Sequence, residues 1–355
     1  MNNRRKGGGI EMSGDNIFEL LKKAGEIKAS DLHITVGSPP IYRVDGELIK
    51  EGETLLTHED TESMAKKLVP EPLYPHFQEH GEVDFSYSLG ELYRFRVNVY
   101  KGKKNVCIAA RVIPSKMPTL ESLGMPDRIR QFCHEPQGLI LVTGPTGSGK
   151  STTIASMINY INRTMKKHII TLEDPIEFLH KHNNSIINQR EVGFDTNNFA
   201  SGLRASLRQD PDVILVGEMR DLETINIAIT AAETGHLVFG TLHTSDAPQT
   251  IDRIIGVFPG HQQSEIRLQL SSVLVGVISQ RLFPKIGGGR IAATEILVNT
   301  PAIANLIRVE KIHQIKSVMQ TSRDIGMHTL DMSIKDLIKG GYVTKETVEN
   351  HLSDM

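Results

Sequence analysis

The spacing of hydrophobic residues changes near the middle of the 355-residue chain. In the first third, short stretches alternate apolar with polar residues, as in residues 93–100, which suits strands with one face in water. Beyond about residue 127, uninterrupted apolar runs alternate with stretches of helical spacing. Such runs are typical of strands that helices cover on both faces. The pattern therefore predicts an antiparallel α+β domain followed by an α/β domain with a parallel sheet.

The first domain is predicted to span residues 16–113. An amphipathic stretch over residues 16–28 indicates a helix that ends near Gly25, and residues 59–68 indicate a second helix. Four stretches are predicted to form antiparallel strands, with Asp45 and Gly46 as a hairpin turn: residues 32–36, 39–44, 83–89 and 93–100. Residues 1–15 carry charges without the apolar core of a secretory signal, so we expect a disordered lead.

The second domain is predicted to span residues 127–300, after a proline-punctuated linker over residues 114–126. Four apolar runs are expected to form a parallel sheet wrapped by helices: residues 139–143, 168–172, 213–217 and 237–241. Ligands of such folds bind beyond the carboxyl ends of the strands, so the residues after each run are candidates for function. Residues 301–355 are predicted to form short helices joined by turns.

A glycine-rich loop follows the first of these runs. Residues 144–151 match G-x-x-x-x-G-K-[ST], and a stretch of helical spacing comes directly after them. In that setting, backbone N–H groups bind a phosphate chain, Lys150 reaches the β- and γ-phosphates, and the Ser151 hydroxyl binds Mg²⁺. We therefore predict a site for ATP and Mg²⁺ made of these residues: Gly144, Pro145, Thr146, Gly147, Ser148, Gly149, Lys150, Ser151 and Thr152. The alternative is a glycine-rich turn that binds nothing.

Two groups of carboxylates are expected beside this loop. The sequence Glu173-Asp-Pro-Ile-Glu177 follows the second run, and Glu218 follows the third run, which the sequence Asp210-Pro-Asp212 precedes. Hydrolysis of a γ-phosphate needs one carboxylate to orient or deprotonate water and another acid on the side of the metal. We assign Glu177 as the base and Glu218 to the metal, and leave the role of Glu173 open. The alternative is that these acids cap the helices that follow.

His236 and His243 are expected to follow the fourth run and are candidate sensors of bound phosphate. Their spacing is not the i, i+4 spacing of a helical zinc pair, and no cysteine lies nearby, so metal ligation is not expected. The alternative for each is a hydrogen-bonded structural histidine.

Arg94 and Arg96 alternate with apolar residues and are expected to share one face of a strand, and Arg111 ends another strand-like run. These arginines either form a solvated face or act as arginine fingers that reach the nucleotide of a neighbouring subunit.

Composition narrows the function classes. The net charge of −2 and the absence of tryptophan give no support to a nucleic-acid partner. Cys107 and Cys133 are the only cysteines, which excludes a disulfide framework and a four-cysteine zinc site and favours a reducing compartment. No apolar stretch approaches the roughly 20 residues of a transmembrane helix. Guanine specificity is not expected, because the Asn-Lys-x-Asp motif is missing.

Taken together, these residues resemble the type IV pilus retraction ATPases, the PilT-like members of the secretion ATPase superfamily. The resemblance runs from about residue 17 to residue 355 and rests on four motifs in order: the phosphate loop, the acidic box at residues 173–177, the Walker B run that ends at Glu218, and the histidine box at residues 235–244. Residues 30–33 and 203–212 match as well.

This resemblance implies a PAS-like first domain and a RecA-like ATPase domain, assembled as a homohexamer. It implies ATP-driven retraction of pilin through a platform protein, with the ring at the cytoplasmic face of the inner membrane and no transmembrane segment of its own. The residue roles that it implies are the catalytic glutamate Glu177, the Walker B acid Glu218, the histidine-box pair His236 and His243, and the nucleotide-facing arginines Arg96 and Arg111.

The direction of work needs a separate argument, because assembly and export ATPases of the superfamily share these boxes. Those relatives typically carry a four-cysteine zinc insertion and a longer N-terminal extension. This sequence has two cysteines and few residues before its first predicted domain, so retraction is the expected direction of work. One departure stands against it: a helix that resembles Ala-Ile-Arg-Asn-Leu-Ile-Arg-Glu in retraction ATPases has Ala304 and Val309 in place of an arginine and the glutamate. A phosphotransferase and a nucleic-acid translocase are further alternatives.

Overall fold

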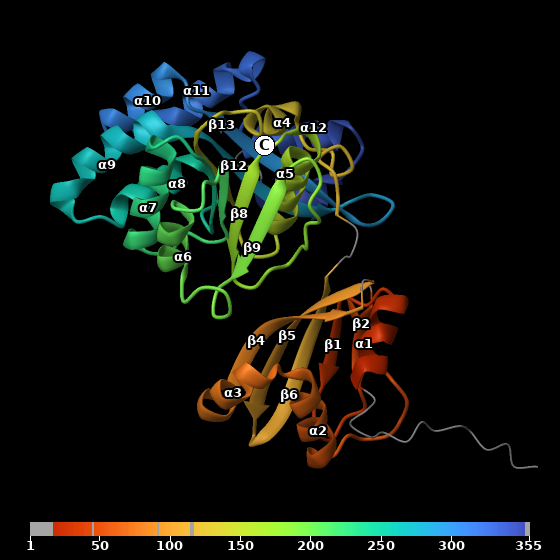
Figure 1. The fold of residues 1–355 in the computed structure, drawn as a ribbon. Helices are drawn as coiled ribbons and strands as arrows, with labels where there is room; N and C mark the ends of the chain where they lie inside the picture. Colours follow the sequence, from red (N-terminus) through yellow and green to blue (C-terminus); the bar gives the residue numbers. More distant parts are fainter. Residues whose placement is uncertain (1–16, 45, 91, 114–116, 352–355) are drawn as a thin grey trace, which may run out of the picture. The chain divides into compact units, whose positions relative to one another are not determined.

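The computed structural model describes residues 17–44, 46–90, 92–113 and 117–351. The chain divides into two compact units, residues 1–116 and 117–355, which we describe one at a time (Figure 1). The expected disordered lead, Asp45 of the expected hairpin turn and residues 114–116 of the expected linker lie outside the described residues.

The first unit is an antiparallel sheet with helices on one face. Its described strands follow the order β3-β2-β1-β6-β5-β4. They are β1 (Asp31–Ile34), β2 (Ile41–Val44), β3 (Glu47–Lys50), β4 (Glu82–Leu89), β5 (Tyr93–Gly102) and β6 (Asn105–Ile113). The described helices are α1 (Ile17–Glu26), α2 (His58–Leu68) and α3 (Tyr74–His80), with a short 3₁₀ turn, η2, at Glu71–Leu73.

The two faces of this sheet differ in polarity because side chains alternate along each strand. Phe95 and Val97 of β5 are fully buried, whereas Arg94 and Arg96 between and beside them lie on the polar face, as predicted. Helix α1 contributes its apolar stripe to the same core, where the Tyr42 hydroxyl donates a hydrogen bond to the Leu20 carbonyl at 3.0 Å. The polar face therefore remains available for charged side chains.

The second unit is built on a mostly parallel sheet of seven described strands, in the order β13-β12-β7-β11-β10-β8-β9. The strands are β7 (Gly138–Thr143), β8 (His168–Glu173), β9 (Ile186–Glu191), β10 (Val213–Val216), β11 (Leu237–Leu242), β12 (Leu274–Pro284) and β13 (Arg290–Val298). All pairs are parallel except β12 with β13. Each side chain of β7, β10 and β11 is buried, as expected for strands that are covered on both faces.

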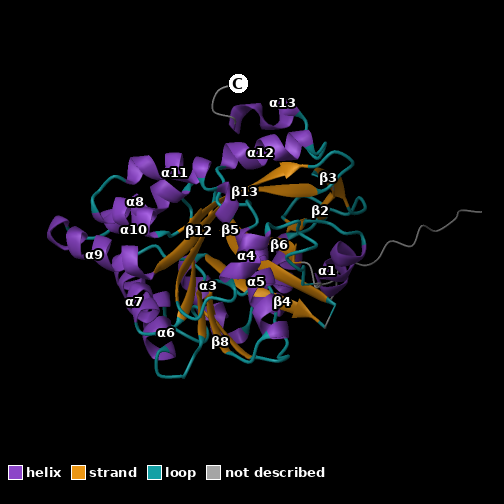
Figure 2. Ribbon diagram, turned by 90° about the horizontal axis from the view of Figure 1, so that it is seen from above, coloured by secondary structure: helices purple, strands orange, loops and turns teal. Residues whose placement is uncertain are grey.

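Helices lie on both faces of this sheet. Figures 1 and 2 show α6, α7 and α8 on one side of the strands and α4 and α5 on the other. The helices are α4 (Asp127–Phe132), α5 (Lys150–Thr164), α6 (Phe199–Ser206), α7 (Leu222–Glu233), α8 (Ala247–Gly256), α9 (Gly260–Val273), α10 (Pro301–Arg308), α11 (Ile315–Thr321), α12 (Leu330–Lys339) and α13 (Lys345–Val348). Short 3₁₀ turns are η3 (Ile312–Gln314), η4 (Arg323–Ile325) and η5 (Glu349–His351).

The predicted fold class is confirmed: a parallel sheet wrapped by helices follows a smaller α+β unit, and short helices end the chain. Sequence analysis missed strands β9, β12 and β13, which extend the sheet on both sides of the four predicted strands. Within the described residues, no helix combines the length and the apolar character that a membrane span requires.

Candidate functional site

Parallel pairing brings four chain segments to one edge of the seven-stranded sheet. Strand β7 pairs with β11 so that Thr143 lies beside Leu242, and β10 aligns Val216 with Leu172 of β8. The segments that follow these strands begin at that edge, which we call the carboxyl edge; the opposite edge, where the strands start, is the amino edge. The glycine-rich loop and the residues that follow β8, β10 and β11 therefore start close together.

The glycine-rich loop has a shape that only glycine allows at its start. Gly144 has a φ of +142°, and a Cβ added there would lie 2.4 Å from the backbone oxygen of Gln280. Gly149, which precedes helix α5, has a φ of +88°. The buried Gln280 amide of β12 donates a hydrogen bond to the Ser148 carbonyl at 2.6 Å and so fixes the far side of the loop. The loop is a tight cradle of backbone that ends at the start of a 15-residue helix.

Lys150 lies within this cradle. Its Nζ donates hydrogen bonds to the carbonyl oxygens of Gly144 at 2.8 Å and Pro145 at 3.1 Å. Burial lowers the pKa of Lys150, and the negative charges of Glu218 and Glu177 oppose that shift. The loop amine and the two predicted carboxylates are therefore close enough to interact electrostatically. A cation inside a backbone cradle at a helix start fits the phosphate chain of a nucleotide.

Glu218 is the centre of a small charged network. Its Oε1 forms an ion pair with Arg220, and the Nε2 of the His243 ring lies 3.1 Å from the same oxygen. The Thr241 hydroxyl donates a hydrogen bond to the Gly217 carbonyl, which links the ends of β10 and β11. The structure thus places His243 beside Glu218, on the edge where it was predicted. Ser151, in the first turn of α5, is an exposed residue.

The two glutamates of the acidic box have different surroundings. The Glu173 carboxylate accepts hydrogen bonds from the Thr171 hydroxyl at 2.6 Å and from Gln189 Nε2 at 3.0 Å. The Glu177 carboxylate is partly exposed, and within the described residues it accepts no hydrogen bond. The Glu173 carboxylate, whose role the sequence left open, is thus already hydrogen-bonded, whereas the Glu177 carboxylate is available to a water molecule.

Three predicted residues lie at the other edge of the sheet. His236 comes before β11 rather than after it, and its carbonyl accepts a hydrogen bond from the Gly138 amide at the start of β7. Its Nδ1 lies 2.9 Å from the Ala231 carbonyl at the end of α7. The expectation that His236 follows its strand is therefore wrong.

The acidic residues before β10 also lie at the amino edge. Asp212 accepts hydrogen bonds from Lys167 Nζ at 3.0 Å and from the His168 amide at 2.9 Å, both at the start of β8. The Asp210 carbonyl lies 3.0 Å from His168 Nδ1. Both aspartates precede their strand, so the expectation that they lie near the phosphate loop is wrong.

Arg96 and Arg111 are neighbours on the polar face of the first unit. They lie directly opposite each other on the paired strands β5 and β6. Arg96 forms an ion pair with Asp84 at 2.8 Å, and Arg111 forms one with Asp31 at 3.1 Å. The Arg111 side chain is 69% exposed, so its guanidinium can still meet another surface.

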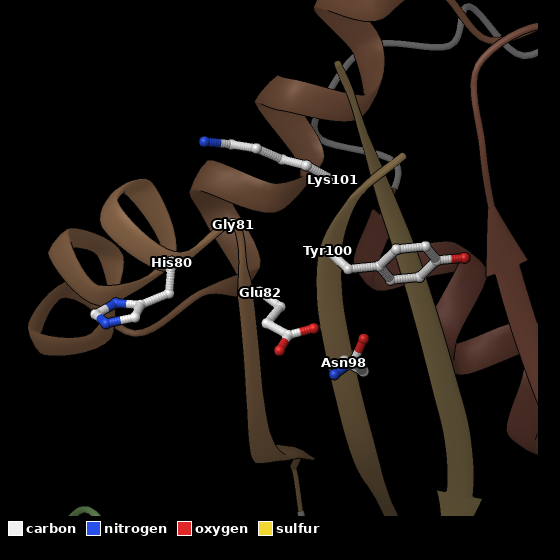
Figure 3. Close-up of a pocket in the computed structure, with 6 residues that line it drawn as sticks. All are labelled: His80, Gly81, Glu82, Asn98, Tyr100 and Lys101. Carbon is white, nitrogen blue, oxygen red and sulfur yellow. The ribbon is translucent and has the colours of Figure 1, made fainter. Parts of the chain in front are cut away.

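The first unit also carries an open groove of about 560 Å³ beside β4 and β5 (Figure 3). Its labelled side chains diverge instead of pointing at one centre: His80, Glu82, Asn98, Tyr100 and Lys101. Lys101 lies over the Phe77 ring, 5.5 Å from its centroid, and donates to the Gln78 carbonyl. We therefore assign no chemistry to this groove.

Sequence analysis missed two glutamines that shape the site. Gln280 is a fully buried polar residue within the apolar strand β12, and this contrast was a usable signal. Gln189 lies on β9, a strand with few apolar residues, and no pattern in the sequence singles it out. Both act on loop backbone through hydrogen bonds, which depend on the folded topology.

Comparison with known proteins places the chain in a family. A model described as Type II/IV secretion system protein matches residues 17–289. The type IV pilus retraction ATPase PilT of Pseudomonas aeruginosa is 49% identical over 331 residues, which are 93% of this chain and 96% of PilT. A twitching motility protein of Neisseria gonorrhoeae is 48% identical and spans 86% of this chain and 82% of its own length.

A solved structure agrees. The crystal structure of the pilus retraction motor PilT with bound ADP has a TM-score of 0.88 at 50% identity and covers 95% of this chain and 97% of the other. Two type II secretion system proteins E, from Xanthomonas campestris and Pectobacterium carotovorum, are 36% and 39% identical to this chain. The matches cover 75% of this chain but only about half of each relative.

The chain therefore belongs to the type II/IV secretion system proteins and, within them, to the PilT-like type IV pilus retraction ATPases. The family expected from the sequence is confirmed, and its retraction branch is favoured over the secretion branch.

Proposed function

We propose that this chain is the motor subunit that drives type IV pilus retraction by hydrolysing ATP at the carboxyl edge of its seven-stranded sheet. The observation that carries the proposal is the position of Lys150, which lies in the glycine-rich cradle and interacts electrostatically with both Glu177 and Glu218. The PilT crystal structure with bound ADP supports nucleotide use in this fold.

The phosphate chain is bound by the loop backbone and by Lys150. The loop turns its backbone around the Lys150 amine, so the γ-phosphate oxygens take the place of the loop carbonyls as partners of that amine. Helix α5 adds the positive end of its dipole to the same site. Binding of this kind is independent of the acid that performs hydrolysis.

Glu177 is the base. Its carboxylate is partly exposed and accepts no hydrogen bond within the described residues, so it is able to orient and deprotonate an attacking water. Glu173 is already engaged by Thr171 and Gln189 and acts as an anchor of the segment. His243, whose ring lies 3.1 Å from Glu218, acts as a sensor of bound phosphate at the start of the segment that follows β11.

A magnesium ion would be held by the hydroxyl of the exposed residue Ser151 and by the Glu218 carboxylate. The residues fit such an ion because a hydroxyl and a carboxylate are oxygen ligands of the kind Mg²⁺ prefers. When bound, the ion neutralises charge on the phosphate oxygens.

The subunits act as a homohexamer at the cytoplasmic face of the inner membrane, where a platform protein connects the ring to pilin. Arg96 and Arg111 of one subunit serve the nucleotide of the next, since both guanidinium groups lie on one polar face and Arg111 is largely exposed. Assembly or export by the same fold is the alternative direction of work. The share and identity of the match to PilT support retraction.

The proposal is tested by phosphate release from Mg-ATP together with the particle mass of the purified chain. We expect turnover that requires Mg²⁺ and a mass near that of six chains. Mixing Arg96→Ala subunits with Lys150→Ala subunits should restore part of the turnover, because one kind of interface then has both an intact loop and an intact arginine. A monomer that hydrolyses ATP at the full rate would contradict the ring.

A further inference from the structure

The segment that carries Glu177 has no regular structure of its own. Residues 174–185, between β8 and β9, form neither helix nor strand. A catalytic carboxylate must be held within a fraction of an ångström of its working position, so the backbone on both sides of it has to be fixed by other contacts. Those contacts come from the neighbouring strand β9.

Two side chains of β9 hold the two residues that flank Glu177. The Ile176 amide donates a hydrogen bond to Glu191 Oε2 at 2.9 Å. On the other side, the Phe178 carbonyl accepts a hydrogen bond from Gln189 Nε2 at 2.8 Å. Ile176 and Phe178 are themselves 7% and 8% exposed, so burial of their side chains holds the same two points.

Gln189 makes two further contacts with this region. Its Oε1 accepts a hydrogen bond from the His180 amide at 2.8 Å, and its Nε2 also donates to Glu173 Oε1 at 3.0 Å. One amide group thus connects the end of β8 to residues on the far side of Glu177. Gln189 lies beside Thr171 in the parallel register of β8 and β9, which sets its distance from the segment.

Glu191 lies two residues further along β9, on the same face as Gln189, and is 8% exposed. Its own amide donates a hydrogen bond to Asp195 Oδ2 at 2.8 Å. Glu191 is therefore fixed by hydrogen bonds of both its backbone amide and its side-chain carboxylate. Strand β9 presents a rigid pair of polar groups to the segment that carries Glu177.

We propose that Gln189 and Glu191 are positioning residues that hold Glu177 in place for water attack, an inference that rests on the proposed function of Glu177. The hydrogen bonds described above join Gln189 and Glu191 to the segment of Glu177 and to Glu173. Their loss should therefore slow hydrolysis and leave ATP binding unchanged.

The test uses Gln189→Leu in the full-length protein, with kcat and the affinity for a non-hydrolysable ATP analogue measured separately. Leucine keeps most of the volume and removes all three hydrogen bonds. We expect kcat to fall by about tenfold to a hundredfold, which is typical of a misplaced catalytic group, and the affinity for the analogue to stay within about twofold. Asn188→Leu is the matched control, since Asn188 is the next residue on the strand and contacts His168 instead.

A double-mutant cycle separates positioning from a general structural effect. In a Glu177→Gln background, adding Gln189→Leu should change kcat by less than about twofold, because the group that Gln189 positions is already inactive. Gln189→Glu keeps the acceptor for His180 and loses both donors; it should reproduce the loss if the leucine variant does not fold. Glu191→Gln retains an acceptor oxygen for Ile176 and should keep most of the activity.

The positioning proposal is overturned if Gln189→Leu keeps the wild-type kcat, if it weakens analogue binding as much as it lowers kcat, or if its effect is additive with Glu177→Gln. Failure of the proposed function has a different signature. In that case Glu177→Gln alone would retain full turnover, whatever the result with Gln189.

Discussion

The carboxyl edge and the amino edge of the seven-stranded sheet carry the same kinds of side chain in different arrangements. At the amino edge, Lys167 is paired with Asp212 at 3.0 Å. At the carboxyl edge, the Lys150 amine donates hydrogen bonds to two loop carbonyls. It is also attracted by the negative charges of Glu177 and Glu218. In the first arrangement, the two charged groups neutralise each other within the fold. The second leaves a cation and a carboxylate available to a ligand, so position relative to the strand ends decides which charges are functional.

The two lysines provide the largest expected contrast. Lys150→Ala should lower ATP turnover by at least about 10²- to 10³-fold, since it removes a fixed positive charge from the reacting phosphate. Lys167→Ala should keep turnover near wild type and cost at most about 1 kcal/mol of unfolding free energy, because its ion pair is partly exposed. Phosphate release and urea unfolding measure both effects. Equal losses of turnover in the two variants would break the contrast between the edges.

Strand β7 offers a second contrast, since a tightly packed glycine stands at each end of it. A Cβ would lie 2.9 Å from the Val273 carbonyl oxygen at Gly138 and 2.4 Å from the Gln280 carbonyl oxygen at Gly144, and both residues have positive φ. Alanine at either position should lower the free energy of unfolding by about 1–3 kcal/mol.

Only Gly144→Ala should also weaken nucleotide binding, because only that glycine belongs to the phosphate cradle. Binding of a fluorescent ATP analogue to the two variants checks this difference. Loss of binding by Gly138→Ala at a temperature where it remains folded would show that the amino edge contributes to the site.

The smallest expected effect concerns His180, which lies in the segment that carries Glu177. Burial lowers the pKa of His180 to about 4, and its Nδ1 has no hydrogen-bond partner among the described residues. As the pH falls, His180 is protonated near pH 6.5 in the unfolded chain but only near pH 4 in the folded chain. Stability is therefore present above pH 6.5 and is lost as the pH falls, by about 2 kcal/mol between pH 7 and pH 5.

His180→Gln should remove this part of the pH dependence. Urea unfolding of the variant and the wild type at pH 7 and pH 5 gives the comparison directly. Identical losses of unfolding free energy in the two proteins would mean that His180 is accessible to protons in the folded state.

The sequence predicted the central strands and the glycine-rich loop because these depend on local patterns: unbroken apolar runs and a fixed spacing around Lys150. His236 and Asp212 come before the predicted runs at residues 237–241 and 213–217, so the error was to group them with the residues that follow those runs. The sequence assigned Glu177 as the base but left the role of Glu173 open. Their difference comes from Gln189 on β9, a strand of mixed polarity whose pairing with β8 is set by tertiary packing.

The proposed function also predicts that Glu177 and Glu173, two acids at the carboxyl edge, differ in their importance for hydrolysis. If the site works as proposed, removing the Glu177 charge stops hydrolysis after ATP has bound, while Glu173 supports the segment from a distance. Glutamine at either position keeps the shape of the side chain, so the two substitutions form a matched pair.

The most direct measurement is therefore phosphate release by Glu177→Gln and Glu173→Gln under saturating Mg-ATP, with analogue affinity measured in parallel. We predict that Glu177→Gln binds the analogue like the wild type and loses about 10²- to 10⁴-fold in turnover, while Glu173→Gln loses less than about tenfold. Turnover by Glu177→Gln within a few-fold of the wild type, or a larger loss in Glu173→Gln, would contradict this account.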